Sequence, residues 1–368
     1  MARPTTMDAP PTDRLVALDL LRGLAALAIV TRHFPWPGDV VAFLPRDYLA
    51  VDLFFVLSGF VLARAWWPRL SEGQGRGRFL IDRLIRLYPL YLLATLFAAA
   101  IALVNGAQAG TWAVTLGANL LFLPAPPDPA TGPNLFPFVY PAWSLFWELL
   151  ANLLLALVAF RLRGPLLPAL LLTGALLLAC TVQELGSLDA GPRWSDFVGG
   201  GFRVLYGFFA GVALALLHRR LPVRVALPDW LIGLALLAAF APGTALAFGA
   251  AYDFLAAILL FPLLVLLGAN ARTTPLSRRI GAGLGGVSYG IYVLHQPVIQ
   301  LAAMIFSAER IGASGVPGMV ALVLVTLAAA WAATRWIDTP LRTWTRRRLR
   351  VQRGSAMPIL TTSSPAAP

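Results

Sequence analysis

Long stretches of the sequence without a charged residue limit the possible folds more than any other feature. Residues 280–308 and 311–334 have no Asp, Glu, Lys or Arg. A helix of about 20 apolar residues is long enough to cross a bilayer. Of the 368 residues, 58% are apolar and 12% are charged, whereas a soluble domain has about 45–50% and about 25%. A soluble enzyme, a coiled coil and a disordered scaffold are therefore excluded, and we predict an integral membrane protein.

Apolar runs along the whole chain predict an all-α, polytopic helix bundle with about ten transmembrane helices. The predicted spans are residues 15–34, 48–67, 86–105, 142–160, 165–184, 197–217, 229–248, 251–269, 285–307 and 316–337. The segment 111–123 is too short for a crossing, and we expect it to be interfacial or re-entrant. We predict one membrane domain over 15–342, preceded by a cytoplasmic segment (1–14) and followed by a basic and then disordered cytoplasmic tail (343–368).

The basic residues are all arginine, and their positions predict the orientation of the spans. Arginines are frequent in alternate connections, namely 64–86, 161–163, 219–224, 272–279 and 342–350, whereas the opposite connections contain only Arg46, Arg193 and Arg310. The positive-inside rule then places both termini in the cytoplasm. Because the arginines lie between apolar spans, we interpret the formal charge of +12 as a signal for the orientation of the spans and for contact with lipid or substrate phosphate. We expect no nucleic-acid binding.

The only cysteine, Cys180, lies inside an apolar run. We therefore expect no disulfide framework and no metal site of the C-x-x-C type. Its surroundings fit a small residue that is buried or faces lipid.

Ionisable side chains inside spans are costly, so each of them in the first two spans is a candidate functional residue. Arg22 and His33 are 11 residues apart, which places them on one helix face and about 16 Å apart along the axis. The alternative is that Arg22 extends to the interface and that His33 is interfacial without chemistry. In the second span Asp52 fits a functional or an interfacial residue, and Ser58 fits a functional residue or, with Gly59, close helix packing.

The fourth span carries a glutamate, Glu148, about one and a half turns below the outer surface and after aromatic residues that include Trp143. A buried carboxylate without a partner takes up a proton, so we expect Glu148 to be a neutral hydrogen-bond donor or the partner of a cation such as His33 or an arginine. The predicted topology brings Glu148 and His33 within about 10 Å of the same surface, which suggests that they work as a unit. Trp143 is a further candidate, although by itself it fits the interfacial aromatic belt.

The ninth span carries Ser288, Tyr292 and His295 with the spacing i, i+4, i+7, which aligns three polar groups on one helix face. Such a stripe has to face the bundle interior or water. With the adjacent Tyr289, these residues are candidates for the site or for a structural hydrogen-bond seam between helices.

A pair of arginines, Arg83 and Arg86, precedes the third span at its cytoplasmic entry. Positive-inside charge explains arginines there in general, but the i, i+3 spacing also places this pair on one helix face. Such a pair suits a phosphate-bearing ligand that arrives from the cytoplasm.

Together these segments resemble the acyltransferase family 3 of membrane proteins, and the resemblance extends from Leu18 to Arg342. The matching motifs, in the family's order, are Leu18-Asp19-Leu20-Leu21-Arg22-Gly23 with His33, Asp52 to Phe60, Arg83-Leu84-Ile85-Arg86, Pro141-Ala142-Trp143-Ser144-Leu145 with Glu148, Ser288-Tyr289-Gly290-Ile291-Tyr292 with His295-Gln296-Pro297, and Asp338-Thr339-Pro340-Leu341-Arg342. The last motif has Asp338 where glutamate is usual in the family.

The resemblance implies a bacterial inner-membrane O-acyltransferase. Its donor would be cytoplasmic acyl-CoA, expected to be acetyl-CoA and acting as a co-substrate with no bound cofactor. The acceptor would be a hydroxyl of a glycan, a lipid-linked saccharide or a secondary metabolite. The family's motifs imply His33 as the catalytic base or acyl carrier, Arg22 as an essential companion and Glu148 as a second polar catalytic residue. Arg83 and Arg86 would contact acyl-CoA.

The expected topology has a mechanistic consequence. CoA is anionic and cytoplasmic while His33 lies toward the outer face, so the pantetheine arm would thread through about half of a bilayer of roughly 30 Å. His33 would deprotonate the acceptor hydroxyl or accept the acyl group and pass it on. The competing class is a transporter or flippase, and the arginine pair and the lack of an apparent inverted repeat argue against it.

Overall fold

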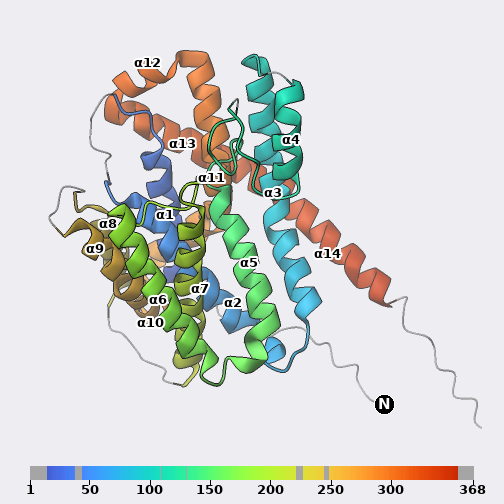
Figure 1. Ribbon diagram of the computed structural model, residues 1–368, viewed down its shortest axis with the longest axis vertical. Coiled ribbons are helices and arrows are strands. Elements are labelled where there is room, and N and C mark those ends of the chain that lie inside the picture. The colour runs from blue at the N-terminus through green and yellow to red at the C-terminus, as the bar shows by residue number, and fades with distance from the viewer. Residues whose placement is uncertain are drawn as a thin grey trace, which may run out of the picture.

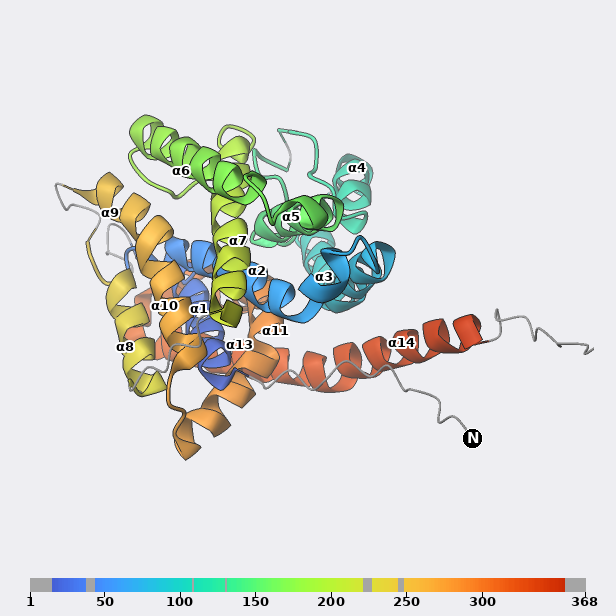
Figure 2. The same ribbon diagram turned by 90° about the horizontal axis from the view of Figure 1, so that it is seen from below.

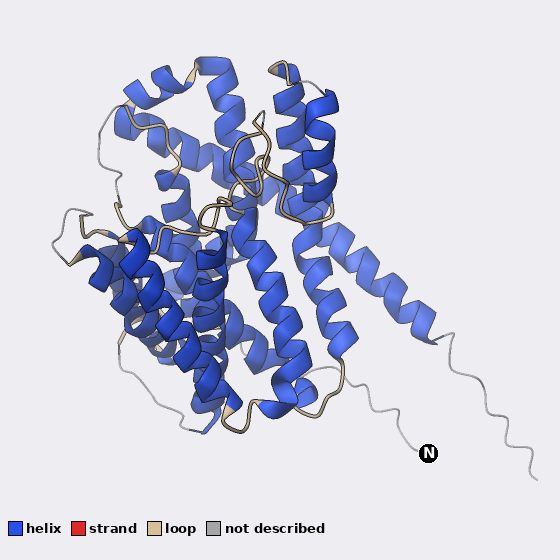
Figure 3. Cartoon of the chain, viewed as in Figure 1, coloured by secondary structure: helices blue, strands red, loops and turns tan. Residues whose placement is uncertain are grey.

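The computed structural model describes residues 15–37, 44–107, 109–129, 131–220, 227–243 and 248–354. Every regular element in these ranges is helical (Figure 3). The elements are α1 (Val16–Arg32), η1 (Asp47–Leu49), α2 (Ala50–Leu70), α3 (Arg76–Val104), α4 (Ala109–Leu120), α5 (Ala142–Val158), η2 (Ala159–Arg161), α6 (Leu166–Leu185), α7 (Phe197–Arg220), α8 (Asp229–Phe240), α9 (Gly249–Leu255), η3 (Ala256–Leu260), α10 (Phe261–Asn270), α11 (Pro275–Phe306), α12 (Ala308–Ala313), α13 (Gly315–Ala333), η4 (Thr334–Asp338) and α14 (Thr339–Gly354). The predicted all-α class is confirmed over the described part of the chain.

Among the described residues, 8 helical segments are long and apolar enough to cross a membrane. Each of them overlaps a predicted span, although Arg76–Val104, Pro275–Phe306 and Gly315–Leu349 extend well beyond the predicted bounds. The two remaining predicted spans correspond to shorter helices, α1 with 17 residues and α8 with 12. Residues 244–247, which belong to the predicted span 229–248, lie outside the described residues. The number of crossings and the side of the termini stay predictions.

The segment predicted to be interfacial or re-entrant forms α4, a helix of 12 residues beside α3 (Figure 1). The Tyr88 hydroxyl donates to the carbonyl of Leu120 at 2.8 Å, and the Tyr91 hydroxyl donates to the carbonyl of Asn119 at 2.5 Å. These bonds tie the end of α4 to α3. A helix of this length rises only about 18 Å, too little for a crossing.

At the C-terminal end, the basic part of the predicted tail continues as helix α14, which runs away from the bundle (Figure 1). The predicted domain boundary at residue 342 therefore falls inside a helix. The predicted disordered part, 355–368, and the segment 1–14 lie outside the described residues.

Glycines bring the central helices into backbone contact. A Cβ atom added to Gly59 on α2 would lie 1.9 Å from the carbonyl oxygen of Phe208 on α7, and one added to Gly285 on α11 would lie 2.5 Å from the Cβ of Asp19 on α1. Only glycine permits such approaches, which are typical of helix pairs in membranes. Seen from below, α8, α9 and α10 lie on one side of these central helices and α3, α4 and α5 on the other (Figure 2).

Much of the exterior of the bundle is apolar, while several charged groups are buried inside it. Leu172 on α6, Leu234 on α8 and Leu324 on α13 are 64%, 54% and 58% exposed, whereas Arg203 and Asp52 are buried. A soluble protein rarely exposes large apolar patches. This distribution is that of a helix bundle whose surface faces lipid.

Candidate active site

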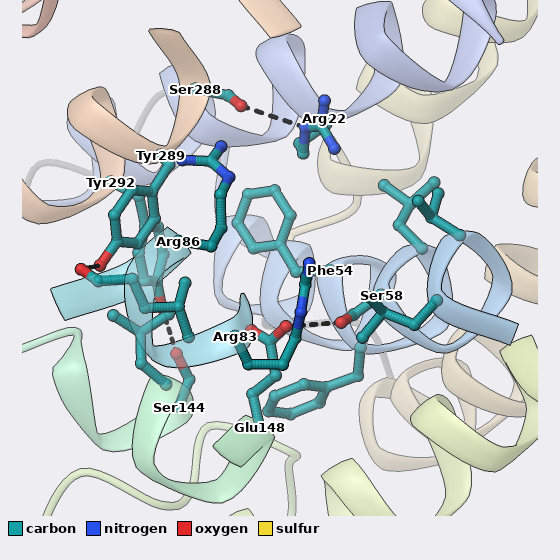
Figure 4. A pocket seen from close by; sticks show the side chains of 16 residues that line it. Arg22, Phe54, Ser58, Arg83, Arg86, Ser144, Glu148, Ser288, Tyr289 and Tyr292 are labelled. Atoms are coloured by element: carbon teal, nitrogen blue, oxygen red, sulfur yellow. Dashed lines mark hydrogen bonds between the residues drawn. The ribbon is translucent and has the colours of Figure 1, made fainter. Parts of the chain in front are cut away.

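Five helices surround a cavity of about 810 Å³, counting its open mouth, which we call the first cavity. Its polar lining consists of Arg22, Ser58, Arg83, Arg86, Ser144, Glu148, Ser288, Tyr289 and Tyr292 (Figure 4). The structure thus brings together most of the candidate residues, from α1, α2, α3, α5 and α11.

Arg22 is held at the first cavity by contacts within α1 and across to α11. Its Nε donates to the Oγ of Ser288 at 3.1 Å, and its Nη2 donates to the carbonyl of Gly285 at 3.3 Å (Figure 4). It also forms an ion pair with Asp19, one turn earlier. About a third of the side chain, 34%, stays accessible, so the guanidinium is positioned and still faces the cavity.

The pair Arg83 and Arg86 lines the first cavity from one face of α3, as the spacing predicts. Arg83 donates to Asp82 at 2.9 Å. The Arg86 guanidinium lies 5.2 Å from the ring centre of Tyr289, within range of a cation–π interaction. Tyr289 is fixed in turn, because its hydroxyl donates to the carbonyl of Leu87 at 2.5 Å.

Glu148 has a hydroxyl partner. Ser58 Oγ donates to Glu148 Oε1 at 2.5 Å across the first cavity (Figure 4). The structure therefore gives this carboxylate a hydroxyl partner from α2, and its cooperation with His33 stays a prediction. The sequence left open whether Ser58 is a functional residue or packs with Gly59 between helices. In the structure Gly59 packs against α7, while Ser58 lines the cavity.

A second cavity of about 370 Å³, counting its mouth, lies around His33 at the end of α1. It is lined by Ile29, Arg32, His33, Tyr48, Val51, Tyr140, Pro141, Trp143, Asp189, Pro192, Arg203 and Tyr292. Tyr292 also lines the first cavity. Tyr292 is therefore a wall residue of both cavities, and its hydroxyl is 2.7 Å from Ser144 Oγ.

The hydrogen bond of His33 determines which ring nitrogen can act as a base. His33 Nδ1 lies 2.9 Å from the carbonyl oxygen of Ile29. A carbonyl only accepts, so Nδ1 carries the proton and Nε2 of the neutral ring keeps its lone pair. The ring centre lies 5.0 Å from that of His295 and 5.6 Å from that of Tyr140.

The polar stripe on α11 faces the bundle interior and follows the two cavities in turn. Ser288 contacts Arg22 at the first cavity, Tyr292 lines both cavities, and His295 packs against the His33 ring. His295 is buried, and its Nε2 has no hydrogen-bond partner among the described residues. The stripe thus combines the two alternatives, since it is both a seam between helices and a lining of the site.

Two candidates contact the buried guanidinium of Arg203. Asp52 forms a two-pronged ion pair with Arg203, at 3.0 Å to Nε and 2.7 Å to Nη2, and both side chains are buried. The indole of Trp143 lies 5.4 Å from the Arg203 guanidinium and is buried. The interpretation of Trp143 as part of the interfacial belt is therefore wrong, because the ring packs on a buried cation and lines the second cavity.

Arg203 itself was not among the sequence candidates, although a signal was present. It is a charged residue within the predicted span 197–217, and the cost of burying a charge applies to it as it does to Glu148. Its remaining donors reach the carbonyls of Ala190 and Tyr48 at 2.8 and 2.9 Å. Asp189 at the second cavity was also missed, and it accepts from Arg32 at 2.5 Å.

Asp338 of the last motif lies between Arg342 and Arg86. It ends the π-helical turn η4 and is buried, and its Oδ2 lies 2.8 Å from Nη1 of Arg342 and 3.7 Å from Nη1 of Arg86. The aspartate therefore reaches α3 despite being shorter than glutamate. Within the described residues, no three His, Cys, Asp or Glu side chains gather as metal ligands would.

The fold and the site define a polytopic membrane protein with a buried polar site at two cavities that share the lining residue Tyr292. The acyltransferase family 3 model, described as an acyltransferase domain, matches residues 15–335, and the chain belongs to this family. It is therefore a membrane-bound acyltransferase that transfers groups other than aminoacyl groups. This membership removes the support for the transporter alternative.

Two bacterial proteins are similar to this chain. Exopolysaccharide production protein ExoZ of Rhizobium meliloti (strain 1021) is 30% identical over 303 residues, which cover 79% of this chain and 88% of ExoZ. Protein 2 in the picA locus of Rhizobium radiobacter is 45% identical over 165 residues, which cover 40% of this chain and 83% of that protein. No solved structure matches the chain.

Proposed function

We propose that this protein transfers an acyl group, acetyl in the first instance, from cytoplasmic acyl-CoA to a hydroxyl of a glycan, glycolipid or similar acceptor. The observation that carries the proposal is the pair of cavities that share Tyr292, one lined by arginines and the other by His33. The relation to an exopolysaccharide production protein favours a polysaccharide acceptor. The expected location is the bacterial inner membrane, with lipid around the apolar exterior.

The first cavity is the donor site in this proposal. Guanidinium groups bind phosphate oxygens through charge-assisted hydrogen bonds, and Arg83 and Arg86 come from a segment that the charge pattern places in the cytoplasm. The pantetheine arm would extend along the cavity toward Tyr292 and bring the thioester to His33. Arg22 and Glu148 line the path, where they would hydrogen-bond the amide groups of the arm and position the thioester.

The second cavity is the place of reaction. His33 Nε2 takes the proton of the acceptor hydroxyl while the hydroxyl oxygen attacks the carbonyl carbon of the thioester. The carbon–sulfur bond breaks, and the CoA thiolate takes the proton back from the imidazolium, so the products are an ester and free CoA. In the two-step alternative Nε2 accepts the acyl group first and passes it to the hydroxyl. Both routes use the same lone pair.

The donor assignment predicts a specific kinetic defect. Replacing both Arg83 and Arg86 by glutamine is expected to raise the apparent KM for acetyl-CoA at least about tenfold, because charge-assisted contacts to phosphate are lost. The rate at saturating acetyl-CoA should fall much less. The measurement is acetyl transfer to endogenous acceptor in isolated membranes, as a function of the acetyl-CoA concentration.

The control is Arg78→Gln, which removes one arginine charge from an exposed position one to two turns earlier on α3. Its KM should stay close to that of the wild type. An unchanged KM in the double variant, with a reduced saturated rate, would place the phosphates elsewhere.

A further inference from the structure

We infer that the C-terminal helix α14 supplies half of the phosphate site, through Arg342 and Arg346, and that these arginines bind the 3′-phosphate of the CoA ribose. The inference rests on the proposed acyl-CoA donor and adds a second pair of binding residues. The sequence predicted positive-inside charge for this helix and placed Arg342 in the last family motif, without assigning a ligand to either arginine.

Two carboxylates join α14 to the arginine pair of α3. Asp82 accepts from Arg83 at 2.9 Å and from Arg346 at 2.7 Å. In the same way, Asp338 lies between Arg86 at 3.7 Å and Arg342 at 2.8 Å. We call these six residues the arginine cluster, and it consists of Arg83, Arg86, Arg342, Arg346, Asp82 and Asp338.

The arginine cluster has more positive than negative charge. Its four guanidinium groups face two carboxylates, which leaves an excess of two positive charges. An excess of this kind beside a low-dielectric wall attracts anions. The cluster is also accessible, because the side chains of Arg342 and Arg346 remain 21% and 42% exposed.

The arginine cluster contains hydrogen-bond donors that have no partner among the described residues. The Nε atoms of Arg83, Arg342 and Arg346 are buried and have no hydrogen-bond partner among the described residues. Buried donors are normally paired, so each of these atoms calls for an acceptor. A phosphate offers several oxygen acceptors and a charge of about −1.5 to −2 at neutral pH.

The position of the two pairs assigns them to different phosphates. Arg83 and Arg86 line the first cavity, whereas Arg342 and Arg346 are not among its lining residues and lie beyond the carboxylates. In CoA the diphosphate lies between the pantetheine arm and the ribose, and the 3′-phosphate lies on the far side of the ribose. With the arm in the cavity, the pair on α3 meets the diphosphate and the pair on α14 meets the 3′-phosphate.

The test compares two probes, CoA and 3′-dephospho-CoA, which differ only in that phosphate. Their dissociation constants for the full-length protein, purified in detergent, are measured by titration calorimetry. The wild type is expected to bind CoA about 10- to 100-fold more tightly than dephospho-CoA. In the Arg342→Gln, Arg346→Gln double variant that preference should disappear, with affinity for dephospho-CoA unchanged. The corresponding double lysine variant should recover part of the preference.

The control is the Arg347→Gln, Arg348→Gln double variant, which removes two exposed arginines from the same helix outside the arginine cluster. It should keep the wild-type preference.

An unchanged preference in the Arg342 and Arg346 variant, or an equal loss of affinity for both probes, overturns the inference and leaves the proposed acyl-CoA donor unaffected. If that variant instead loses binding to vesicles of anionic lipid with its CoA preference intact, these arginines bind lipid phosphate and the inference is again overturned. A wild type that binds neither probe overturns the proposed donor as well.

Discussion

Replacing His33 by alanine is expected to lower acyl transfer at least about a hundredfold, which is the lower end of what a general base contributes. The reason is the geometry at the second cavity, where Nδ1 donates to the carbonyl of Ile29 and Nε2 keeps the lone pair. The KM for acetyl-CoA should change little, because the proposed phosphate contacts lie at the first cavity. The measurement is labelled acetyl incorporation in membranes that contain equal amounts of the two proteins.

The chain offers a matched control for this variant. His218, the histidine outside the site, forms a hydrogen bond through Nε2 with Oδ1 of Asn270 at 3.1 Å and lines neither cavity. His218→Ala should keep transfer within a few-fold of the wild type. Turnover at the wild-type rate in folded His33→Ala protein would remove His33 from the chemistry.

The second large effect is expected in stability. Arg203→Ala should destabilise the protein by about 3–5 kcal/mol, because it leaves the carboxylate of Asp52 buried without its ion partner. The purified variant should show a lower midpoint of thermal unfolding in detergent and a smaller monodisperse fraction. Arg193→Ala is the comparison, since Arg193 is 51% exposed in its pair with Asp196 and such pairs contribute at most about 1 kcal/mol.

The ion pair can also be removed as a whole. A variant with Asp52→Leu and Arg203→Met replaces both charges by apolar groups, which is often neutral for stability. Its midpoint of thermal unfolding should return most of the way to the wild-type temperature, and transfer activity should return with the folded protein. An unchanged midpoint in Arg203→Ala would contradict the structural role of the pair. A double variant that is stable but inactive would return Asp52 to the catalytic candidates.

Whether a feature of the site can be predicted depends on how far apart in the sequence its residues are. The stripe of Ser288, Tyr292 and His295 follows from helical periodicity alone, since only one face of a helix can carry it into the interior. The partners of these residues could not be predicted. The pair Asp52 and Arg203 is 151 residues apart in the sequence, and hydropathy does not say which helices are neighbours.

Glu148 is a second example in which the sequence does not identify the partner. The cost of a buried carboxylate correctly indicates that it has a partner, and the topology suggests His33 at a similar depth. The structure supplies Ser58, 90 positions away, from a helix that crosses beside it. Depth along the membrane follows from residue counting at 1.5 Å per residue, whereas rotation and neighbourhood depend on packing, here on glycines such as Gly59.

Span prediction has a different source of error. A window of apolar residues identifies helices such as α6 and α13 well, because lipid-facing residues and core residues are both apolar. It gives full-length spans for α1 and α8, whose helices have 17 and 12 residues. Hydropathy reports burial in an apolar medium and does not mark where the helical hydrogen bonds end.

The most direct measurement is the sidedness of transfer in sealed membrane vesicles from cells that contain the protein and its acceptor. Labelled acetyl-CoA, which does not cross membranes, is added outside. Inverted vesicles expose the cytoplasmic face, and we expect them to label the glycan fraction, with at least about a hundredfold less label in His33→Ala vesicles. Sealed right-side-out vesicles should label it only after they are permeabilised. Equal labelling by sealed right-side-out vesicles would contradict a cytoplasmic donor that is used across the membrane.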